Sequence, residues 1–151
     1  MRDSPSSFYG SCRQRGSMLL EGLIGLLIFS VGVIAFIGMQ AAAVRDTADA
    51  KYRADASFLA NQIIGRMWSD RANLAAYAHR PSGAVCAPTG ANSVNANVAN
   101  WLSSVNGLLP GALAATQQIT IGANNLVTVG LCWQIGDTPP HNLVVTAQIQ
   151  G

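Results

Sequence analysis

Residues 17–44 read SMLLEGLIGLLIFSVGVIAFIGMQAAAV, an apolar run in which Glu21 is the one ionisable side chain. The 23 residues from Gly22 to Val44 carry no charge. As an α-helix rising about 1.5 Å per residue, they would be roughly 34 Å long, which is enough to cross the hydrocarbon core of a bilayer. The sequence therefore predicts a membrane-spanning helix close to the start of the chain.

The composition of the whole chain allows one modest folded domain beside this run. The chain has 151 residues, and a single hydrophobic core usually takes about 100–150. Only 11% of the residues are charged, whereas about a quarter are charged in an average soluble protein. The net charge of +2 is small and the Lys and Arg residues are scattered. This argues against nucleic acid as a partner, because nucleic-acid binding requires a clustered basic face.

Three kinds of segment could explain the apolar run. A cleaved secretory signal has an apolar stretch of about 7–15 residues, so this run is too long, although 41–43 offers three small alanines near a possible cleavage site. A plain single-span anchor explains the length but leaves Glu21 without a role. The third kind is a precursor that is cut just before the run.

The residues that precede the run support a cut of this kind. Residues 12–16 read CRQRG, so a short basic stretch ends in glycine where the apolar run begins. A cut after Gly16 would give Ser17 a free amino group, four positions before Glu21. A carboxylate entering lipid costs a few kcal/mol unless it is paired. In a bundle of such helices, Glu21 could meet the terminal amine of a neighbouring subunit and set the axial register of assembly.

Residues 15–21, RGSMLLE, followed by the long apolar helix, resemble the type III signal of type IV prepilins. The resemblance implies that prepilin peptidase cleaves between Gly16 and Ser17, that the new amino group of Ser17 is methylated, and that Glu21 guides assembly. Arg13 and Arg15 would be the basic residues of the leader. The usual family residue after the cut is Phe, and this chain has Ser17 there instead.

Further along, residues 26–33, 38–40 and 60–64 resemble PilV-like minor pilins, and the resemblance covers about the first 70 residues. It implies a structural subunit, not an enzyme, that joins a type IV pilus or primes the assembly of one. The implied processes are pilus biogenesis, twitching motility and adhesion. The implied partners are other pilin and minor pilin subunits, prepilin peptidase and the inner membrane, with no cofactor. Many major pilins have a helix proline that this chain lacks, which favours a minor subunit.

The resemblance also implies a location, with a single pass through the inner membrane, a periplasmic C-terminal part, and a final place in the extracellular pilus. Basic residues are balanced on the two sides of the run, so the positive-inside rule does not decide the orientation. The short leader and the large C-terminal part favour an N-terminus on the cytoplasmic side. Two alternatives remain open: a minor pseudopilin of a type II secretion system, and a membrane-anchored periplasmic binding module.

The expected fold is α+β, with a long N-terminal helix packed on a small antiparallel sheet, as in type IV pilins. We expect a leader at 1–16, a membrane or filament-core helix at 17–44, an amphipathic continuation at 45–78, and a globular periplasmic head at 79–151. No proline interrupts the helix before Arg80. One face of its second half would carry the apolar side chains at helical spacing, namely Tyr52, Leu59, Ile63 and Met67.

Within the head, spacing predicts a short helix at 97–109, with Trp101 in the core, ended by Pro110 and Gly111. Alternation of apolar and polar residues predicts antiparallel strands within 117–150, near 117–122, 126–134 and 142–149. Proline, glycine and asparagine between residues 81 and 90 predict a loop.

Cysteines and histidines complete the prediction. Cys12 lies in the leader, so the mature chain keeps Cys86 and Cys132. In an oxidising compartment these could form a disulfide between the loop and the central strand, although two buried free thiols are the alternative. Neither cysteine has a second ligand at metal-binding spacing, so no metal site is expected. His79 and His141 lie near prolines in predicted loops, where we expect solvated side chains, and no catalytic motif accompanies them.

Overall fold

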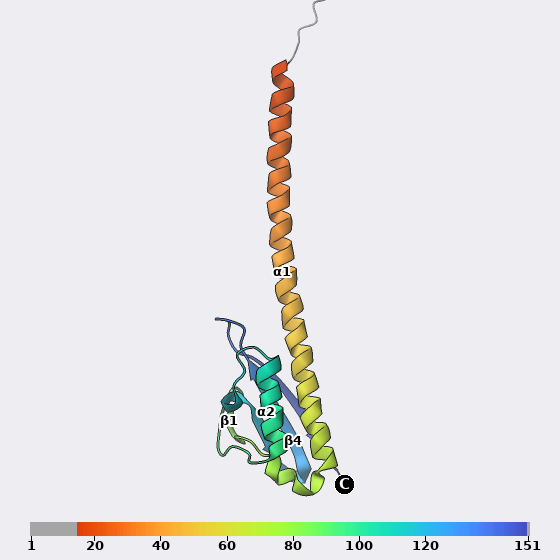
Figure 1. The fold of residues 1–151 in the computed structure, drawn as a ribbon, viewed down its shortest axis with the longest axis vertical. Coiled ribbons are helices and arrows are strands. Elements are labelled where there is room, and N and C mark those ends of the chain that lie inside the picture. The colour runs from red at the N-terminus through yellow and green to blue at the C-terminus, as the bar shows by residue number, and fades with distance from the viewer. Residues whose placement is uncertain (1–14, 151) are drawn as a thin grey trace, which may run out of the picture. The chain divides into compact units, whose positions relative to one another are not determined.

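The structure is a computed structural model that describes residues 15–150, with side chains from residue 17 onward. Within these residues, helix α1 (Arg15–Ser69) precedes a second helix, short 3-10 helices and two antiparallel sheets (Figure 1). The chain divides into two compact units, residues 1–45 and 46–151, and α1 contributes to both. The predicted α+β class, with a long N-terminal helix and a small antiparallel sheet, is confirmed.

The first unit is the apolar part of α1. Every described side chain from residue 17 to residue 45 is exposed. The segment is long and apolar enough to span a membrane, with a mean hydropathy of 2.5 over its best window. An apolar helix that buries none of its side chains against the described residues is what a bilayer or a helix bundle would have to cover.

In the second unit, α1 supplies one wall of the hydrophobic core. Leu59, Ile63 and Met67 are fully buried, and Tyr52 packs against them while partly exposed, so the predicted apolar face is confirmed. Their spacing places them on one side of a 3.6-residue turn. Across the core lie buried residues of the second helix and the sheet, including Trp101, Val105, Ile119, Val127, Val129, Leu131 and Ile149.

Helix α1 ends at Ser69, before the predicted boundary at residue 78, and continues as the 3-10 helix η1 (Arg71–Tyr77). The carboxylate of Asp70 accepts hydrogen bonds from Asn73 Nδ2, at 2.7 Å, and from the Tyr77 hydroxyl, at 3.0 Å. A short acidic side chain that binds groups just after it competes with the α-helical ladder, which explains the change of helix type. Burial raises the pKa of Tyr77 above its ordinary value of 10.0.

The second helix, α2 (Ala96–Leu108), begins at a side-chain cap. The Asn95 side chain accepts a hydrogen bond from the backbone N–H of Asn97 at 2.8 Å, which satisfies one of the free donors at a helix start. Trp101 is fully buried, as predicted, and its Nε1 donates to the Leu59 carbonyl at 2.9 Å. This bond ties α2 to α1 across the core.

The connection that follows α2 turns at a glycine. Gly111 has φ of +60°, and a Cβ placed there would lie 2.6 Å from the Gln134 carbonyl oxygen. Both the backbone conformation and the close approach therefore require glycine. The Gln134 backbone N–H donates to the Pro110 carbonyl at 3.0 Å, which fastens this turn to the end of the central strand.

The larger sheet has three strands whose order in space follows their order in the chain. β3 (Gln118–Ile121), β4 (Leu126–Trp133) and β5 (His141–Gln148) are antiparallel, in the order β3-β4-β5. Each strand begins and ends within one residue of its predicted range. The turn between β3 and β4 contains η3 (Ala123–Asn125), whose two asparagines adopt positive φ, a conformation that Asn tolerates better than most residues.

A second, two-stranded sheet replaces the loop predicted between residues 81 and 90. β1 (Ser82–Ala84) and β2 (Ala87–Thr89) form an antiparallel hairpin. In its turn Cys86 adopts φ of +68°, and within β1 Gly83 adopts φ of +86°. The guanidinium of Arg80 donates twice to the Pro88 carbonyl, at 3.0 and 3.2 Å, and closes the base of the hairpin. Strands of three residues are too short to show a periodic pattern in the sequence, and this hairpin is held by side chains that lie outside its two strands.

Candidate functional site

The exposed apolar part of α1 is the first candidate site, because none of its large apolar side chains is buried among the described residues. The large apolar side chains of this segment are between 41% and 79% exposed. They are Met18, Leu19, Leu20, Leu23, Ile24, Leu26, Leu27, Ile28, Phe29, Val31, Val33, Ile34, Phe36, Ile37, Met39 and Val44. A contiguous apolar surface of this kind marks contact with lipid or with other proteins.

Ser17 and Glu21 lie one helical turn apart at the start of this segment, and both side chains are exposed. Positions i and i+4 share one helix face, so both groups are presented to the same neighbour. Within residues 17–150, no ion pair or side-chain hydrogen bond engages Glu21. Cys12 and Arg13 lie outside the described residues, while Arg15 and Gly16 form the start of α1.

Glycines on the same segment leave room for close helix contacts. Around a Cβ placed at Gly25 or Gly32, no described heavy atom lies within 4 Å apart from the adjacent residues and the nearby backbone of α1, so the space beside them is open. These two positions are seven residues apart and differ by only about 20° in direction around the helix. Small residues on one face allow helix backbones to approach each other in a membrane or bundle.

Four charged groups along the second part of α1 form two ion pairs with each other. Lys51 Nζ lies 3.0 Å from Asp55 Oδ2, and Arg53 Nε lies 2.9 Å from Asp49 Oδ2. The hydrogen bond to Asp55 raises the pKa of Lys51 above its ordinary value. Exposed pairs of this type contribute little to stability, so their main effect is to keep this part of the helix hydrated.

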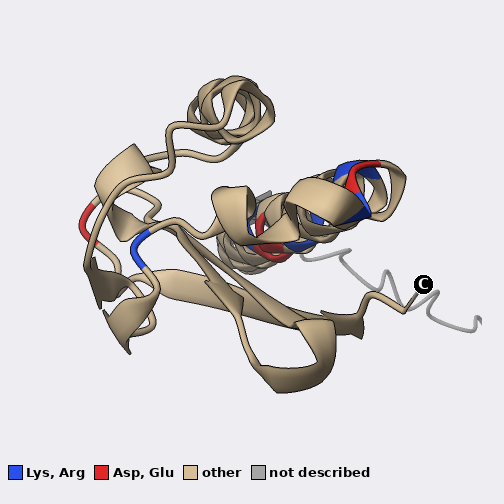
Figure 2. Cartoon of the chain, turned by 90° about the horizontal axis from the view of Figure 1, so that it is seen from below, with Lys and Arg blue, Asp and Glu red and all other residues tan. Residues whose placement is uncertain are grey.

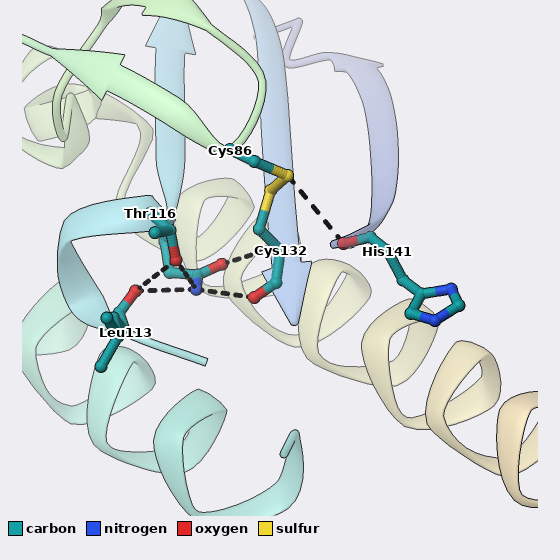
Figure 3. The surroundings of a disulfide bond; sticks show 6 residues. Cys86, Leu113, Thr116, Cys132 and His141 are labelled. Atoms are coloured by element: carbon teal, nitrogen blue, oxygen red, sulfur yellow. Dashed lines mark hydrogen bonds between the residues drawn. A yellow bond between two sulfur atoms is a disulfide. The ribbon is translucent and has the colours of Figure 1, made fainter. Parts of the chain in front are cut away.

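A disulfide joins the turn of the β1–β2 hairpin to the central strand of the larger sheet. Cys86 and Cys132 are bonded, with their Cα atoms 5.4 Å apart, which is an ordinary separation for a disulfide (Figure 3). This is the pairing left by the sequence once Cys12 is assigned to the leader. Cys86 Sγ also lies 3.9 Å from the His141 carbonyl oxygen, so the bond lies beside the start of β5.

Gln117 holds the strand end beside this disulfide, a role that the sequence did not predict. It follows η2 (Ala114–Thr116) and is fully buried. Its Oε1 accepts from the Cys132 N–H at 2.9 Å, while Nε2 donates to the Cys132 and Leu113 carbonyls at 3.0 and 2.8 Å (Figure 3). The amide therefore satisfies both backbone groups of Cys132 just before β3 begins. Alternation had counted Gln117 as a polar strand residue, and no local pattern identifies this bond.

The prediction of a solvated loop histidine is wrong for His79. Its side chain is only 2% exposed. Nδ1 accepts a hydrogen bond from the Ser93 N–H at 3.2 Å, and Nε2 donates to the Ala114 carbonyl at 3.0 Å, so these bonds assign the Nε2–H tautomer. The backbone of His79 also forms a bridge to Ile119 of β3. His79 is a structural residue that fastens the segment after η1 to the sheet.

His141 also departs from the prediction, because it begins strand β5 and is partly buried. Its ring stacks on Trp133, with ring centroids 5.7 Å apart. Nδ1 lies 3.6 Å from Asp49 Oδ1, an oxygen that is itself buried and has no hydrogen bond. The stacking places an imidazole between α1 and the sheet, where it links two layers of the core.

Two hollows lie on the second unit. A cavity of about 100 Å³ adjoins the disulfide and Trp133, and it has room for only a few water molecules. A more open groove of about 320 Å³ is lined by Lys51, Tyr52 and residues 106–111. Among the described residues, no three His, Cys, Asp or Glu side chains gather as a metal site would require.

Searches of protein-family models, of curated proteins and of solved structures find no match for this chain. Its function is therefore inferred from its own residues and contacts.

Proposed function

We propose that this chain is a minor pilin, a structural subunit that is inserted in the inner membrane, trimmed after Gly16, and built into a type IV pilus. The observation that carries the proposal is the apolar helix at residues 17–44, which is exposed along its whole length and has a single carboxylate, Glu21, at its start. A plain anchor accounts for the apolar surface. It does not account for a carboxylate one turn inside that surface, and within residues 17–150 no ion pair engages it.

In this proposal the same surface serves two environments in turn. Before assembly, the segment 17–44 spans the bilayer, and lipid covers its apolar side chains. During assembly, equivalent helices of neighbouring subunits replace the lipid, and Gly25 and Gly32 allow them to pack closely. Transfer from lipid to a helix bundle exchanges one apolar surrounding for another, so the segment stays shielded from water throughout.

The carboxylate of Glu21 would then fix how far one subunit is inserted relative to the next. Its partner would be the amino group of Ser17 on a neighbouring subunit, created by the cut. At 4 Å and an effective dielectric constant of 20, such a pair is attracted by about 4 kcal/mol, from which the desolvation of both charges must be subtracted. A slip of one heptad moves the carboxylate by about 10 Å and removes the attraction. The pair therefore acts mainly through register.

Overall charge supports close packing of subunits. The proposed leader holds three of the nine Lys and Arg residues and one of the seven Asp and Glu residues, so the trimmed chain has six of each. A subunit without net charge packs among copies and relatives without long-range repulsion. The disulfide would keep the head intact after it leaves the periplasm.

The mature N-terminus tests the proposed processing. We expect intact-mass and peptide mass spectrometry of the full-length chain, isolated from its native host, to find a polypeptide that begins at methylated Ser17. A Gly16→Leu variant should retain the leader, because the resemblance implies that the cut follows Gly16 and the substitution changes that residue. An unmodified leader on chains recovered from surface filaments would contradict the proposal.

A substitution at Glu21 tests the register role separately. We expect Glu21→Val to leave membrane insertion and processing unchanged and to lower the amount of this subunit in sheared pili by about tenfold or more, since the lost pair would be worth a kcal/mol or more. Immunoblots of the pilus and membrane fractions measure both quantities. Glu21→Asp, which keeps the charge, is the matched control and should retain most of the incorporation. Wild-type incorporation of the Val variant would exclude the register role.

A further inference from the structure

Strand β5 (His141–Gln148) forms an open edge of the larger sheet. It pairs with β4 on one side, and no strand of the described chain pairs with its other side. The pairing with β4 runs residue for residue over all eight positions without a bulge. The outer edge of β5 is therefore long and regular.

The hydrogen-bond pattern shows which backbone groups face away from β4. Ile149 donates its N–H to the Asn125 carbonyl, and these residues are the pair that follows Gln148 and Leu126 in the register. Hydrogen-bonded pairs alternate along an antiparallel ladder, so residues 141, 143, 145 and 147 face β4. The N–H and C=O groups of the remaining residues point outward, and no described backbone group pairs with them. These are Asn142, Val144, Thr146 and Gln148.

Proteins usually protect such an edge, and this one carries none of the usual protection. Lysine, inward charges, proline within the strand, bulges and short length all discourage pairing with another chain. Residues 138–150 contain no charged side chain, and Pro139 and Pro140 precede the strand. In Figure 2 the charged residues lie elsewhere, and the sheet has none.

The opposite edge of the same sheet is protected. β3 (Gln118–Ile121) has only four residues, and its outer side is occupied where His79 and Ile119 exchange backbone hydrogen bonds of 3.0 and 2.9 Å. The side chain of Gln118 also donates to the Ser82 carbonyl of the hairpin at 3.1 Å. One edge is short and covered while the other is long and bare, which indicates that β5 is kept open for pairing.

We propose that the outer edge of β5 binds an extended, uncharged segment of a partner protein, which adds to the sheet as a fourth strand. The partner segment would alternate polar and apolar side chains. One face of β5 is exposed and displays Asn142 and Thr146, while the other face places Leu143 and Val145 against the core, partly buried. An uncharged edge gives no attraction to a charged segment, and its desolvation on pairing disfavours one. The pairing edge lies in the second unit and does not depend on Glu21, whereas the choice of a different protein over a second copy rests on the proposed membrane anchoring of residues 17–44.

A second copy of this chain fits the same edge less well. Antiparallel pairing of two β5 strands about a two-fold axis would turn the two α1 segments, residues 46–69, in opposite directions. Two chains anchored in one membrane through residues 17–44 are poorly placed for that arrangement. A segment supplied by a different protein has no such constraint.

Amide hydrogen exchange of the full-length, isotope-labelled chain in detergent micelles tests the inference. The probe is an acetylated and amidated peptide of sequence NLVVTAQ, a copy of residues 142–148 that carries no charge and forms a strand in this fold. Without the probe, the outward amides of Val144 and Thr146 should exchange fast while those of Leu143 and Val145 exchange slowly. With millimolar probe, we expect the outward amides to slow by about tenfold or more.

A Val144→Pro variant supplies the matched control. The Val144 N–H points away from β4, so proline there removes an outward donor and leaves the β4–β5 ladder in place. We expect the variant to fold and to lose the probe effect, as should a Thr146→Lys variant, which adds a charge to the edge. Outward amides that do not respond to the probe, or that slow equally in Val144→Pro, would overturn the proposal. Protected outward amides in a probe-free dimer, found by sedimentation, would assign the edge to a second copy and overturn it too.

Discussion

At the scale of single residues, Gln117 has a structural role that could not be predicted from its residue type. Its buried amide closes the hydrogen bonds of Cys132, at the point where β3 no longer accompanies β4. A strand end inside a core needs such a partner, because unpaired buried backbone groups are costly. Glutamine is suited to the role because its amide offers the same donor and acceptor as a peptide group.

Replacing the Gln117 side chain should show how much these hydrogen bonds contribute to the free energy of unfolding. We expect Gln117→Ala to lower the free energy of unfolding by about 1–3 kcal/mol, since it leaves the N–H and C=O of Cys132 buried and unpaired. Denaturant unfolding of the second unit, followed by tryptophan fluorescence, measures the change. Gln150→Ala is the control, because Gln150 is exposed, and it should change stability by less than about 0.5 kcal/mol. Equal effects of the two substitutions would show that the bonds of Gln117 contribute nothing.

At the scale of elements, the β1–β2 hairpin depends on connections to residues far from it in the chain. Each strand has only three residues, which is too short for independent stability. The Cys86–Cys132 bond, which spans 46 residues, fastens its turn to β4, and the Arg80 side chain closes its base. The hairpin is therefore a product of tertiary contacts.

Removing the disulfide should loosen this hairpin before the rest of the second unit. For a loop of 46 residues, the chain-entropy estimate predicts a loss of about 4 kcal/mol in the Cys86→Ala, Cys132→Ala double variant. Urea unfolding gives the total loss, and amide exchange should accelerate most at residues 82–89. Reduction of the wild type with dithiothreitol serves as the control and should give a similar loss. A loss below about 1 kcal/mol, or uniform acceleration, would argue against the disulfide as the main fastening of the hairpin.

At the scale of the whole molecule, the chain joins two units of different character, one with an exposed apolar surface and one with a hydrophobic core. The core of the second unit draws its members from Tyr52 onward, and the described residues before residue 46 contribute none of it. Residues 17–45, the part of the first unit whose side chains are described, form an apolar surface and bury no side chain. The folding of the second unit should therefore not require the apolar segment.

Truncation tests this independence. We expect residues 46–151, produced alone in an oxidising compartment, to remain soluble without detergent and to unfold within about 1 kcal/mol of the same unit in the full-length chain, because no core contact is removed. The full-length chain should instead partition into lipid vesicles in a flotation assay. Aggregation of the truncated chain, or a much larger loss of stability, would show that the segment before residue 46 supports the fold of the second unit.

The sequence by itself determined the features that rest on periodicity and on long uniform runs. It predicted the apolar helix and the position of Glu21 within it, the buried face of α1 around Leu59 and Ile63, and the strands of the larger sheet. Each of these depends on the order of residues that are close together in the sequence. Spacing alone could also identify Trp101 as a core residue, since the other apolar residues of α2 share its face.

Only the tertiary structure decided the burial of His79, the role of Gln117, the hairpin at residues 82–89 and the end of α1 at Ser69. Each depends on partners that are distant in sequence or on one side-chain hydrogen bond. Patterns among neighbouring residues do not predict such contacts. The two edges of the sheet differ for the same reason. Alternation predicts three strands, but which edge is covered depends on where His79 and the hairpin lie in space, and that leaves β5 open.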